Sequence, residues 1–176
     1  MQQINLERMK ELDYFSNEAY KSLRTNMQFC GSDVRMICFT SCLPNEGKSN
    51  VSFNLAMSFA ENGKKVIFVD ADLRRSVIAG RYKPDSSVIG LAHFLSGQNT
   101  FEEIFYQTSI ENLDMIFTGS IPPNPAELVG SDLFNRLIQM LREKYDYVII
   151  DTPPLGSVID SAIIAEQCDG VVLVIE

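Results

Sequence analysis

The chain has 176 residues, of which 45 % are apolar and 22 % charged, a balance that suits one globular domain whose core needs no disulfide or structural metal. Its net charge is −8, and its Lys and Arg residues form no clustered patch. Because nucleic acids are bound through clustered cations, this distribution argues against a nucleic-acid partner.

Taken in chain order, the predicted elements alternate between helices and strands. Residues 1–33 are polar and compatible with a helix, and we predict that they form an N-terminal helical segment outside the main domain. Strands are expected at 34–40, 65–70, 112–118, 146–151 and 170–175, and helices at 49–62, 130–143 and 157–167, with two short helices in 88–106 broken at Ser96 and Gly97. Several strands are apolar on both faces, so we predict a three-layer α/β/α domain over 34–176 with a mainly parallel sheet.

The cysteines and the hydropathy pattern indicate a cytoplasmic protein. The four cysteines form neither a CxxC pair nor a Cys/His ligand spacing, so we expect reduced thiols that bind no metal. No apolar run approaches the roughly 20 residues that span a bilayer. The N-terminus carries early acidic residues and lacks the apolar core of a signal peptide. Any association with a membrane is therefore expected to come through a partner.

A candidate phosphate-binding loop follows the first strand of the main domain. Residues 40–49 read TSCLPNEGKS and lie between a strand and a helix, the context in which a Gly-Lys-Ser sequence forms a P-loop. Backbone N–H groups at such a helix start bind phosphate oxygens, Lys48 can reach the β- and γ-phosphates, and the Ser49 hydroxyl can bind Mg²⁺. The predicted nucleotide-binding residues are Pro44, Asn45, Glu46, Gly47, Lys48, Ser49 and Asn50.

The loop departs from the standard GxxxxGK(S/T) pattern at its first position. Cys42 occupies the place of the first glycine, and Asn45 lies within the turn. Asn is the non-glycine residue that best tolerates a positive φ, so we expect the loop to turn tightly nonetheless. The alternative is an ordinary strand-to-helix turn that happens to contain Gly-Lys-Ser.

Three aspartates come at the ends of strands that should finish near this loop. Asp70 and Asp72 close the second strand of the main domain, two residues apart and expected on one side, and Asp151 closes the fourth. Parallel strands place their carboxyl ends at one edge, so these carboxylates should lie beside the phosphate loop. Mg²⁺ takes one or two carboxylates beside water and phosphate, which leaves one carboxylate to accept a proton from an attacking hydroxyl. The alternative is that the aspartates only cap the following helices.

Four segments of the chain resemble the bacterial tyrosine kinases, the P-loop kinases of capsule and exopolysaccharide systems. They are 18–26 (EAYKSLRTN), 40–49, 69–75 (VDADLRR) and 121–128 (IPPNPAEL), and the strand 148–154 (VIIDTPP) is shared with the wider group of related ATPases. The first and fourth segments are specific to the kinases. The resemblance implies an ATP-dependent protein-tyrosine autokinase that needs Mg²⁺ and regulates capsular and exopolysaccharide synthesis and export.

The resemblance also carries roles to the motif residues. Lys48, Asp70 and Asp72 are expected to be catalytic, and Ser49, Asp72 and Asp151 are expected to bind Mg²⁺. Asp151 lies on the neighbouring strand and is the expected metal partner. We therefore assign the base that receives the tyrosine proton to Asp70, with Asp72 as the alternative.

Self-association and partners are implied in the same way. The family's E-x-x-R-x-x-R element, which packs subunits into a ring, falls on Glu18, Lys21 and Arg24, and Lys21 departs from the pattern because lysine lacks the planar fork of arginine. The implied partners are a membrane-anchored activator of the polysaccharide co-polymerase type, which recruits the kinase to the inner face of the membrane, and proteins that carry substrate tyrosines. Family members end in a tyrosine-rich tail that this sequence lacks, so we expect a chain truncated at its C-terminus.

A partitioning or site-placement ATPase of the same fold is the main alternative. Such ATPases carry a second lysine five residues before the conserved one, where this chain has Leu43. A metal-cluster reductase would need bridging cysteines in the matching loops, and a nucleotide-binding pseudo-enzyme is at odds with the complete set of Lys48, Ser49 and three aspartates. His93, the single histidine, lies far from every motif and is expected to be structural.

Overall fold

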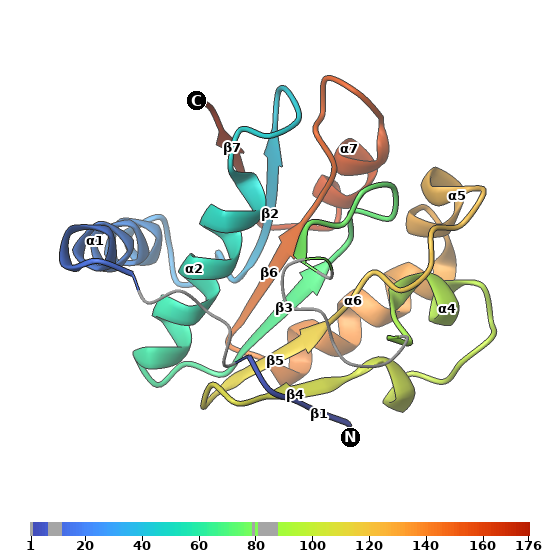
Figure 1. Ribbon diagram of the computed structural model, residues 1–176, viewed down its shortest axis with the longest axis horizontal. Helices are drawn as coiled ribbons and strands as arrows, with labels where there is room; N and C mark the ends of the chain where they lie inside the picture. Colours follow the sequence, from blue (N-terminus) through green and yellow to red (C-terminus); the bar gives the residue numbers. More distant parts are fainter. Residues whose placement is uncertain (1, 7–11, 79, 81–87) are drawn as a thin grey trace.

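A seven-stranded sheet forms the centre of the computed structural model, which describes residues 2–6, 12–78, 80 and 88–176 (Figure 1). The strand order is β1-β4-β5-β3-β6-β2-β7, and neighbouring strands are parallel except for β4 and β5. The strands are β1 (Gln2–Ile4), β2 (Met36–Ser41), β3 (Val66–Asp70), β4 (Tyr106–Thr108), β5 (Leu113–Ile116), β6 (Tyr147–Asp151) and β7 (Gly170–Val174). The mainly parallel sheet predicted from the sequence is confirmed.

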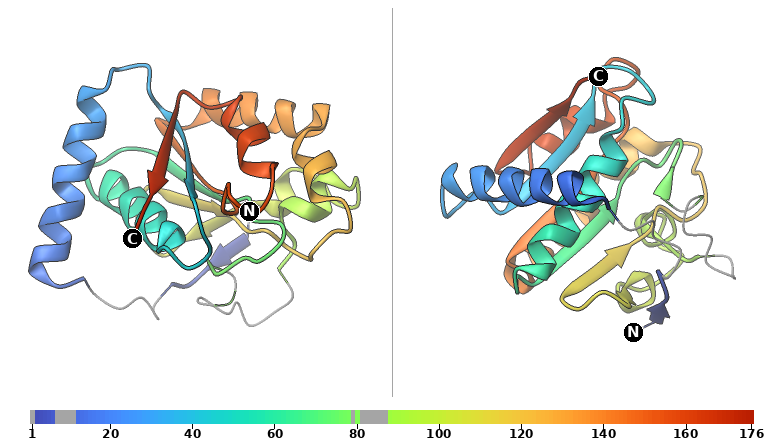
Figure 2. Two further views of the ribbon diagram at one scale, coloured as in Figure 1. Left: turned by 90° about the horizontal axis from the view of Figure 1, so that it is seen from above. Right: turned by 60° about the vertical axis from the view of Figure 1, so that its left-hand side comes forward.

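Helices cover both faces of this sheet. Those in the described part of the chain are α1 (Tyr14–Phe29), α2 (Lys48–Glu61), α4 (Leu91–Leu95), α5 (Pro125–Val129), α6 (Asp132–Lys144) and α7 (Asp160–Ala165), with a short 3₁₀-helix at Glu102–Ile104. Figure 2 shows α1 and α2 on one side of the sheet and α5, α6 and α7 on the other. The three-layer α/β/α fold expected from the sequence is therefore also confirmed.

The central strands are apolar along their whole length because both of their faces are buried. In β2, Met36 and Cys38 belong to the core under α4, α5, α6 and α7, whereas Ile37 and Phe39 belong to the core under α2. All four side chains are at most 1 % exposed. Burying a large aliphatic or aromatic side chain contributes roughly 1.5–3 kcal/mol, so the two cores hold the sheet firmly between its helical layers.

The N-terminal part of the chain contains both a helix and a strand. Helix α1 begins after Asp13, whose carboxylate accepts the N–H of Ser16 at 3.0 Å, and it packs on α2 through side chains that include Leu23. The helical prediction for 1–33 is therefore confirmed for α1, but it is wrong for Gln2–Ile4, which pairs with β4 in parallel. The part of the predicted segment at 7–11 lies outside the described residues, and its separation from the main domain stays a prediction.

Most elements after residue 33 lie within about three residues of their predicted places, as expected for sequence-based boundaries. The exceptions are α5, which was not predicted, and 88–106. In 88–106, α4 ends at Leu95, just before the predicted break at Ser96, but the second segment is only a single 3₁₀ turn. Strand β4 follows that turn and was not predicted. Its three residues are too few to show the alternation by which strands are recognised.

The parallel strands bring three chain segments to one edge of the sheet. Strand β2 ends at Ser41, where the phosphate loop starts, and the last residues of β3 and β6, Asp70 and Asp151, are register partners. Ligands of such sheets bind beyond the carboxyl ends of the strands, so the fold itself selects this edge as the place for a site. Within the described part of the chain, no helix has the length and apolar character needed to cross a bilayer.

Candidate active site

The loop between β2 and α2 adopts the tight turn expected of a phosphate loop. Asn45 and Gly47 have φ angles of 69° and 80°, which is the left-handed region that Asn and Gly tolerate best. The Glu46 carboxylate accepts the backbone N–H of Leu43 at 2.6 Å, which closes the loop on itself. Lys48 then begins α2 and is buried. The loop therefore leads into a helix N-terminus, where N–H groups and the helix dipole favour an anion.

Lys48 lies between Asp72 and Asp151, two of the three carboxylates that were predicted to lie beside the phosphate loop. Its ammonium is 3.4 Å from Asp72 and 3.4 Å from Asp151, and it donates to the Ser49 hydroxyl at 3.0 Å. Asp151 also accepts a hydrogen bond from Ser52 at 3.2 Å, a contact that was not predicted from the sequence. Burial raises the pKa of Asp151, although the charge of Lys48 acts in the opposite direction. The structure thus brings together a lysine, a hydroxyl and two carboxylates.

Asp70 adjoins this cluster, because it is the register partner of Asp151 at the end of β3. Its carboxylate accepts hydrogen bonds from the Ser76 hydroxyl and, at 3.4 Å, from the backbone N–H of Asp72. Burial, followed by the nearby charge of Asp151, raises the pKa of Asp70 to about 7. The expectation that Asp70 and Asp72 point to one side stays a prediction. The two carboxylates have different partners, Ser76 for Asp70 and Lys48 for Asp72.

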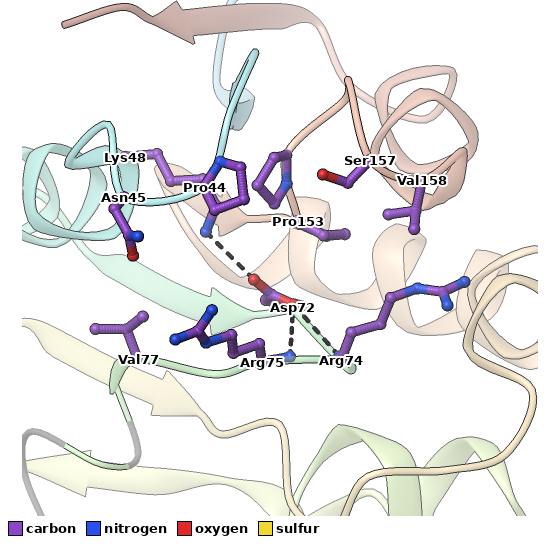
Figure 3. Close-up of a pocket in the computed structure, with 11 residues that line it drawn as sticks. Pro44, Asn45, Lys48, Asp72, Arg74, Arg75, Val77, Pro153, Ser157 and Val158 are labelled. Atoms are coloured by element: carbon purple, nitrogen blue, oxygen red, sulfur yellow. Dashed lines mark hydrogen bonds and ion pairs between the residues drawn. The ribbon is translucent and has the colours of Figure 1, made fainter.

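A pocket of about 180 Å³ opens beside the Lys48 ammonium (Figure 3). The phosphate loop lines it through Pro44, Asn45 and Lys48, and Asp72 lines it from the end of β3. The other predicted nucleotide-binding residues, Glu46, Gly47, Ser49 and Asn50, belong to the same loop and helix start but do not line the pocket. Ligand pockets are usually larger than this, so the volume suits the phosphate end of a nucleotide.

Two neighbouring arginines, Arg74 and Arg75, line the same pocket, and neither was predicted from the sequence to have a role. Their backbone N–H groups both donate to Asp72, at 3.3 Å from Arg74 and 3.0 Å from Arg75, which fixes the Asp72 carboxylate. The Arg74 side chain makes two bonds of 2.9 Å to Asp160, whose side chain is 1 % exposed. The one sequence signal that could have identified them as site residues was their position shortly after the Asp-Ala-Asp sequence.

The segment after β6 is fastened to the phosphate loop. Leu155 donates its N–H to Ser41 at 2.8 Å, and Gly156 donates its N–H to Cys42 at 3.2 Å. A Cβ atom on Gly156 would lie only 2.3 Å from the Cys42 carbonyl oxygen, so no other residue fits without moving the backbone. The two segments therefore form one wall of the site.

The donor set fits Mg²⁺, which the sequence analysis predicted. Mg²⁺ prefers oxygen ligands and takes one or two carboxylates together with water and phosphate oxygens. Ser49, Asp72 and Asp151 offer a hydroxyl and two carboxylates around one ammonium. Over the described ranges, no three His, Cys, Asp or Glu side chains gather closely enough to hold a metal by themselves. The residues thus suit a metal that is shared with a phosphate ligand.

The three residues predicted to mediate self-association have different environments. Lys21 pairs with Glu18 at 2.8 Å on the exposed face of α1. Arg24 instead donates to the Ser58 carbonyl at 2.6 Å and to its hydroxyl at 3.1 Å, which ties α1 to α2. His93 accepts the N–H of Gly90 at 3.1 Å and serves the α4 turn, in agreement with a structural role.

A phosphate loop at the carboxyl edge of a parallel sheet, with buried aspartates around its lysine, defines a P-loop nucleotide-binding domain. A family model described as an AAA domain matches residues 34–176. The chain is 44 % identical over 167 residues to the tyrosine-protein kinase CpsD of Streptococcus pneumoniae serotype 4, covering 94 % of this chain and 74 % of that protein. It is 39 % identical over 175 residues to the tyrosine-protein kinase YwqD of Bacillus subtilis, covering 98 % and 73 %.

Solved structures agree with these sequence relatives. The kinase domain of the Escherichia coli tyrosine kinase ETK matches with a TM-score of 0.85 at 33 % identity, over 90 % of this chain and 62 % of that one. The septum site-determining protein MinD of Pyrococcus horikoshii matches less well, with a TM-score of 0.67 at 27 % identity over 80 % of this chain and 57 % of that one. The chain belongs to the bacterial tyrosine-protein kinases, and the partitioning-type alternative is disfavoured.

Proposed function

We propose that this protein is an ATP-dependent tyrosine kinase that phosphorylates tyrosines of its own kind and of other proteins, in control of capsular and exopolysaccharide synthesis. The observation that carries the proposal is the buried ammonium of Lys48 held between Asp72 and Asp151 at the end of the phosphate loop. Phosphoryl transfer needs this combination of positive charge on the phosphates and carboxylates beside them. The relatives named as tyrosine-protein kinases support tyrosine as the group that accepts the phosphate.

The reaction requires that a tyrosine hydroxyl lose its proton as it attacks. The tyrosine oxygen forms a bond to the γ-phosphorus while the bond to the bridging oxygen of ADP breaks, and ADP leaves with the electron pair. Tyrosine has an ordinary pKa near 10, so a carboxylate that accepts the proton speeds the attack. We assign this base to Asp70, whose pKa of about 7 suits proton transfer near neutral pH. Asp72, which lines the pocket, is the alternative.

The remaining site residues orient and neutralise the phosphates. Lys48 is placed to contact the β- and γ-phosphates, and the loop N–H groups bind their oxygens. Ser49, Asp72 and Asp151 would hold Mg²⁺, which supplies positive charge to the phosphate oxygens when it is bound. Because Lys48 already faces both carboxylates, the cluster is arranged for ligand binding without a large rearrangement of side chains.

We place the enzyme at the cytoplasmic face of the membrane, recruited there by a membrane-anchored activator of the polysaccharide co-polymerase type, and assembled as a homo-oligomer. Helix α1 supports the assembly, because its face away from α2 exposes Tyr14, Phe15 and Phe29 at 73 %, 82 % and 83 %. Glu18 and Lys21 lie on the same exposed surface. In this proposal 1–33 is the oligomerisation segment and 34–176 the kinase domain.

The test is a phosphorylation assay with ATP, Mg²⁺ and a tyrosine-containing peptide or partner tail, read out by phosphotyrosine detection. The parent protein is expected to transfer phosphate. Lys48→Met, assayed at a temperature at which its unfolding curve shows it to be folded, is expected to lose the activity. Transfer at the parent rate by Lys48→Met would count against the site. A folded parent protein that binds Mg²⁺ and ATP but modifies no tyrosine with any supplied activator would instead overturn the kinase assignment.

A further inference from the structure

The cationic side chains that line the pocket differ in whether they are paired with carboxylates. Lys48 faces two carboxylates at 3.4 Å each. Arg74 is held by a two-point contact with the buried Asp160. The rest of the phosphate loop adds no positive charge, because Leu43 is apolar and 63 % exposed and Glu46 is acidic.

Arg75 is the exception among these cations. Its backbone is fixed, because its N–H donates to Asp72 at 3.0 Å, but its exposed guanidinium has no ion-pair partner among the residues that the structure describes. Figure 3 shows the guanidinium on the same side of the pocket as the Lys48 ammonium and Asn45, whereas Arg74 extends in the opposite direction. Among the described residues that line the pocket, Arg75 is therefore the cation without an ion-pair partner, and its backbone N–H also positions the Asp72 carboxylate.

We propose that Arg75 binds the terminal phosphate of ATP and so makes the pocket prefer ATP to ADP, an inference that rests on the nucleotide site of the proposed function. A guanidinium presents a planar fork that pairs with two phosphate oxygens, and it stays charged at all working pH values. Lys48 alone cannot neutralise the additional negative charge of the third phosphate, because Asp72 and Asp151 already offset the charge of its ammonium. Arg75 adds positive charge on the open side of the pocket.

Arg75, rather than Arg74, is the arginine we assign to the phosphate, because Arg74 has a structural role. Replacing Arg74 would leave Asp160 buried without its cation, which makes Arg74 a structural residue. Replacing Arg75 leaves no described carboxylate unpaired, so the change should not alter folding. Arg136 on the exposed surface of α6 offers a matched control that removes the same charge from a place outside the pocket.

The experiment measures the affinity of Arg75→Gln, Arg75→Lys, Arg74→Gln and Arg136→Gln for MgADP and for a non-hydrolysable imido analogue of MgATP by calorimetry. A charge-assisted hydrogen bond is worth enough that Arg75→Gln should weaken binding of the analogue about tenfold or more. Its affinity for MgADP should change by less than about twofold, because ADP lacks the group that Arg75 contacts. Arg75→Lys should fall between parent and Arg75→Gln, since lysine keeps the charge but not the fork.

The controls separate this inference from the proposed function. Arg136→Gln should keep the parent affinities, and Arg74→Gln should lower thermal stability but keep the parent ratio of the two affinities. A parent protein that binds the analogue no better than MgADP, or an Arg75→Gln variant that loses affinity for both equally, overturns the inference while the kinase assignment stands. A parent protein that binds neither nucleotide overturns both together.

Discussion

Replacing Asp70 by asparagine should reduce catalysis and raise stability in the same protein. The substitution keeps the size of the side chain and can still bond to Ser76 and to the N–H of Asp72, but it removes a charge that is fully buried beside Asp151. If Asp70 accepts the tyrosine proton, phosphorylation should slow by roughly 10²–10⁴. Affinity for Mg²⁺ and ATP should stay near the parent value.

The stability effect follows from the raised pKa of Asp70. The pKa is about 7 in the folded protein against 3.8 for an ordinary aspartate, so the folded state binds the proton more tightly between these values. The free energy of unfolding of the nucleotide-free parent should therefore fall as the pH rises through this window. About three pH units at about 1.4 kcal/mol each set an upper limit on the order of 4 kcal/mol. Asp70→Asn should lack this fall and be more stable than the parent at pH 8.

The assay combines urea unfolding at pH 5 and pH 8, without metal or nucleotide, with single-turnover phosphorylation at saturating Mg²⁺ and ATP. Asp33→Asn, on an exposed turn, controls for the loss of one charge. Tyrosine phosphorylation by Asp70→Asn at the parent rate would refute the assignment of the base and leave Asp72 as the candidate. A parent protein whose stability does not fall between the two pH values would refute the reasoning from burial.

Three further predictions concern the contact between Gly156 and the phosphate loop, the contacts of Asp169 with the start of β2, and the metal. Gly156→Ala should lower ATP affinity at least about tenfold, because its Cβ would displace the Cys42 carbonyl. Gly80→Ala, whose Cβ would meet no described atom within 4 Å, should bind ATP like the parent. Calorimetry measures both affinities, and equal values for the two variants would contradict the close approach. Asp169→Ala should destabilise the protein by about 1–3 kcal/mol in urea unfolding at neutral pH, because it removes the acceptor of two backbone N–H groups and of Arg142; an unchanged midpoint would count against this. Removing Mg²⁺ with EDTA should weaken ATP binding in the parent far more than in Asp151→Asn, and equal losses would argue against Asp151 as a ligand.

Stability at low pH should depend on the same Asp169 contact. Burial raises the pKa of Asp169, but hydrogen bonds from Met36, Arg142 and Arg35 outweigh it and hold the pKa below its usual value. A depressed carboxylate pKa adds stability above the unfolded value, and that stability is lost as the pH falls through the folded value. The difference in the free energy of unfolding between the parent and Asp169→Ala, measured with urea, should therefore become smaller as the pH is lowered.

The order of elements and the location of the site were readable from the sequence because both depend on local patterns. Apolar strands alternate with helical spacing, which defines a parallel sheet under helices on both faces. The Gly-Lys-Ser sequence and the strand-end aspartates then had to meet at one edge, since parallel strands share their carboxyl ends. Lys48, Ser49, Asp72 and Asp151 lie together as that argument requires.

Tertiary structure decided what each charged residue does. Asp70 and Asp72 look equivalent in sequence, yet β3 ends between them, so one is enclosed beside Ser76 and the other faces Lys48. Arg74 and Arg75 are adjacent, yet only Arg74 meets Asp160, which lies 86 residues further along the chain. Strands β1 and β4 were hidden because their three residues gain stability only from pairing. Local pattern sets the direction of a side chain inside a regular element, but beyond its end the direction depends on contacts with distant parts of the chain.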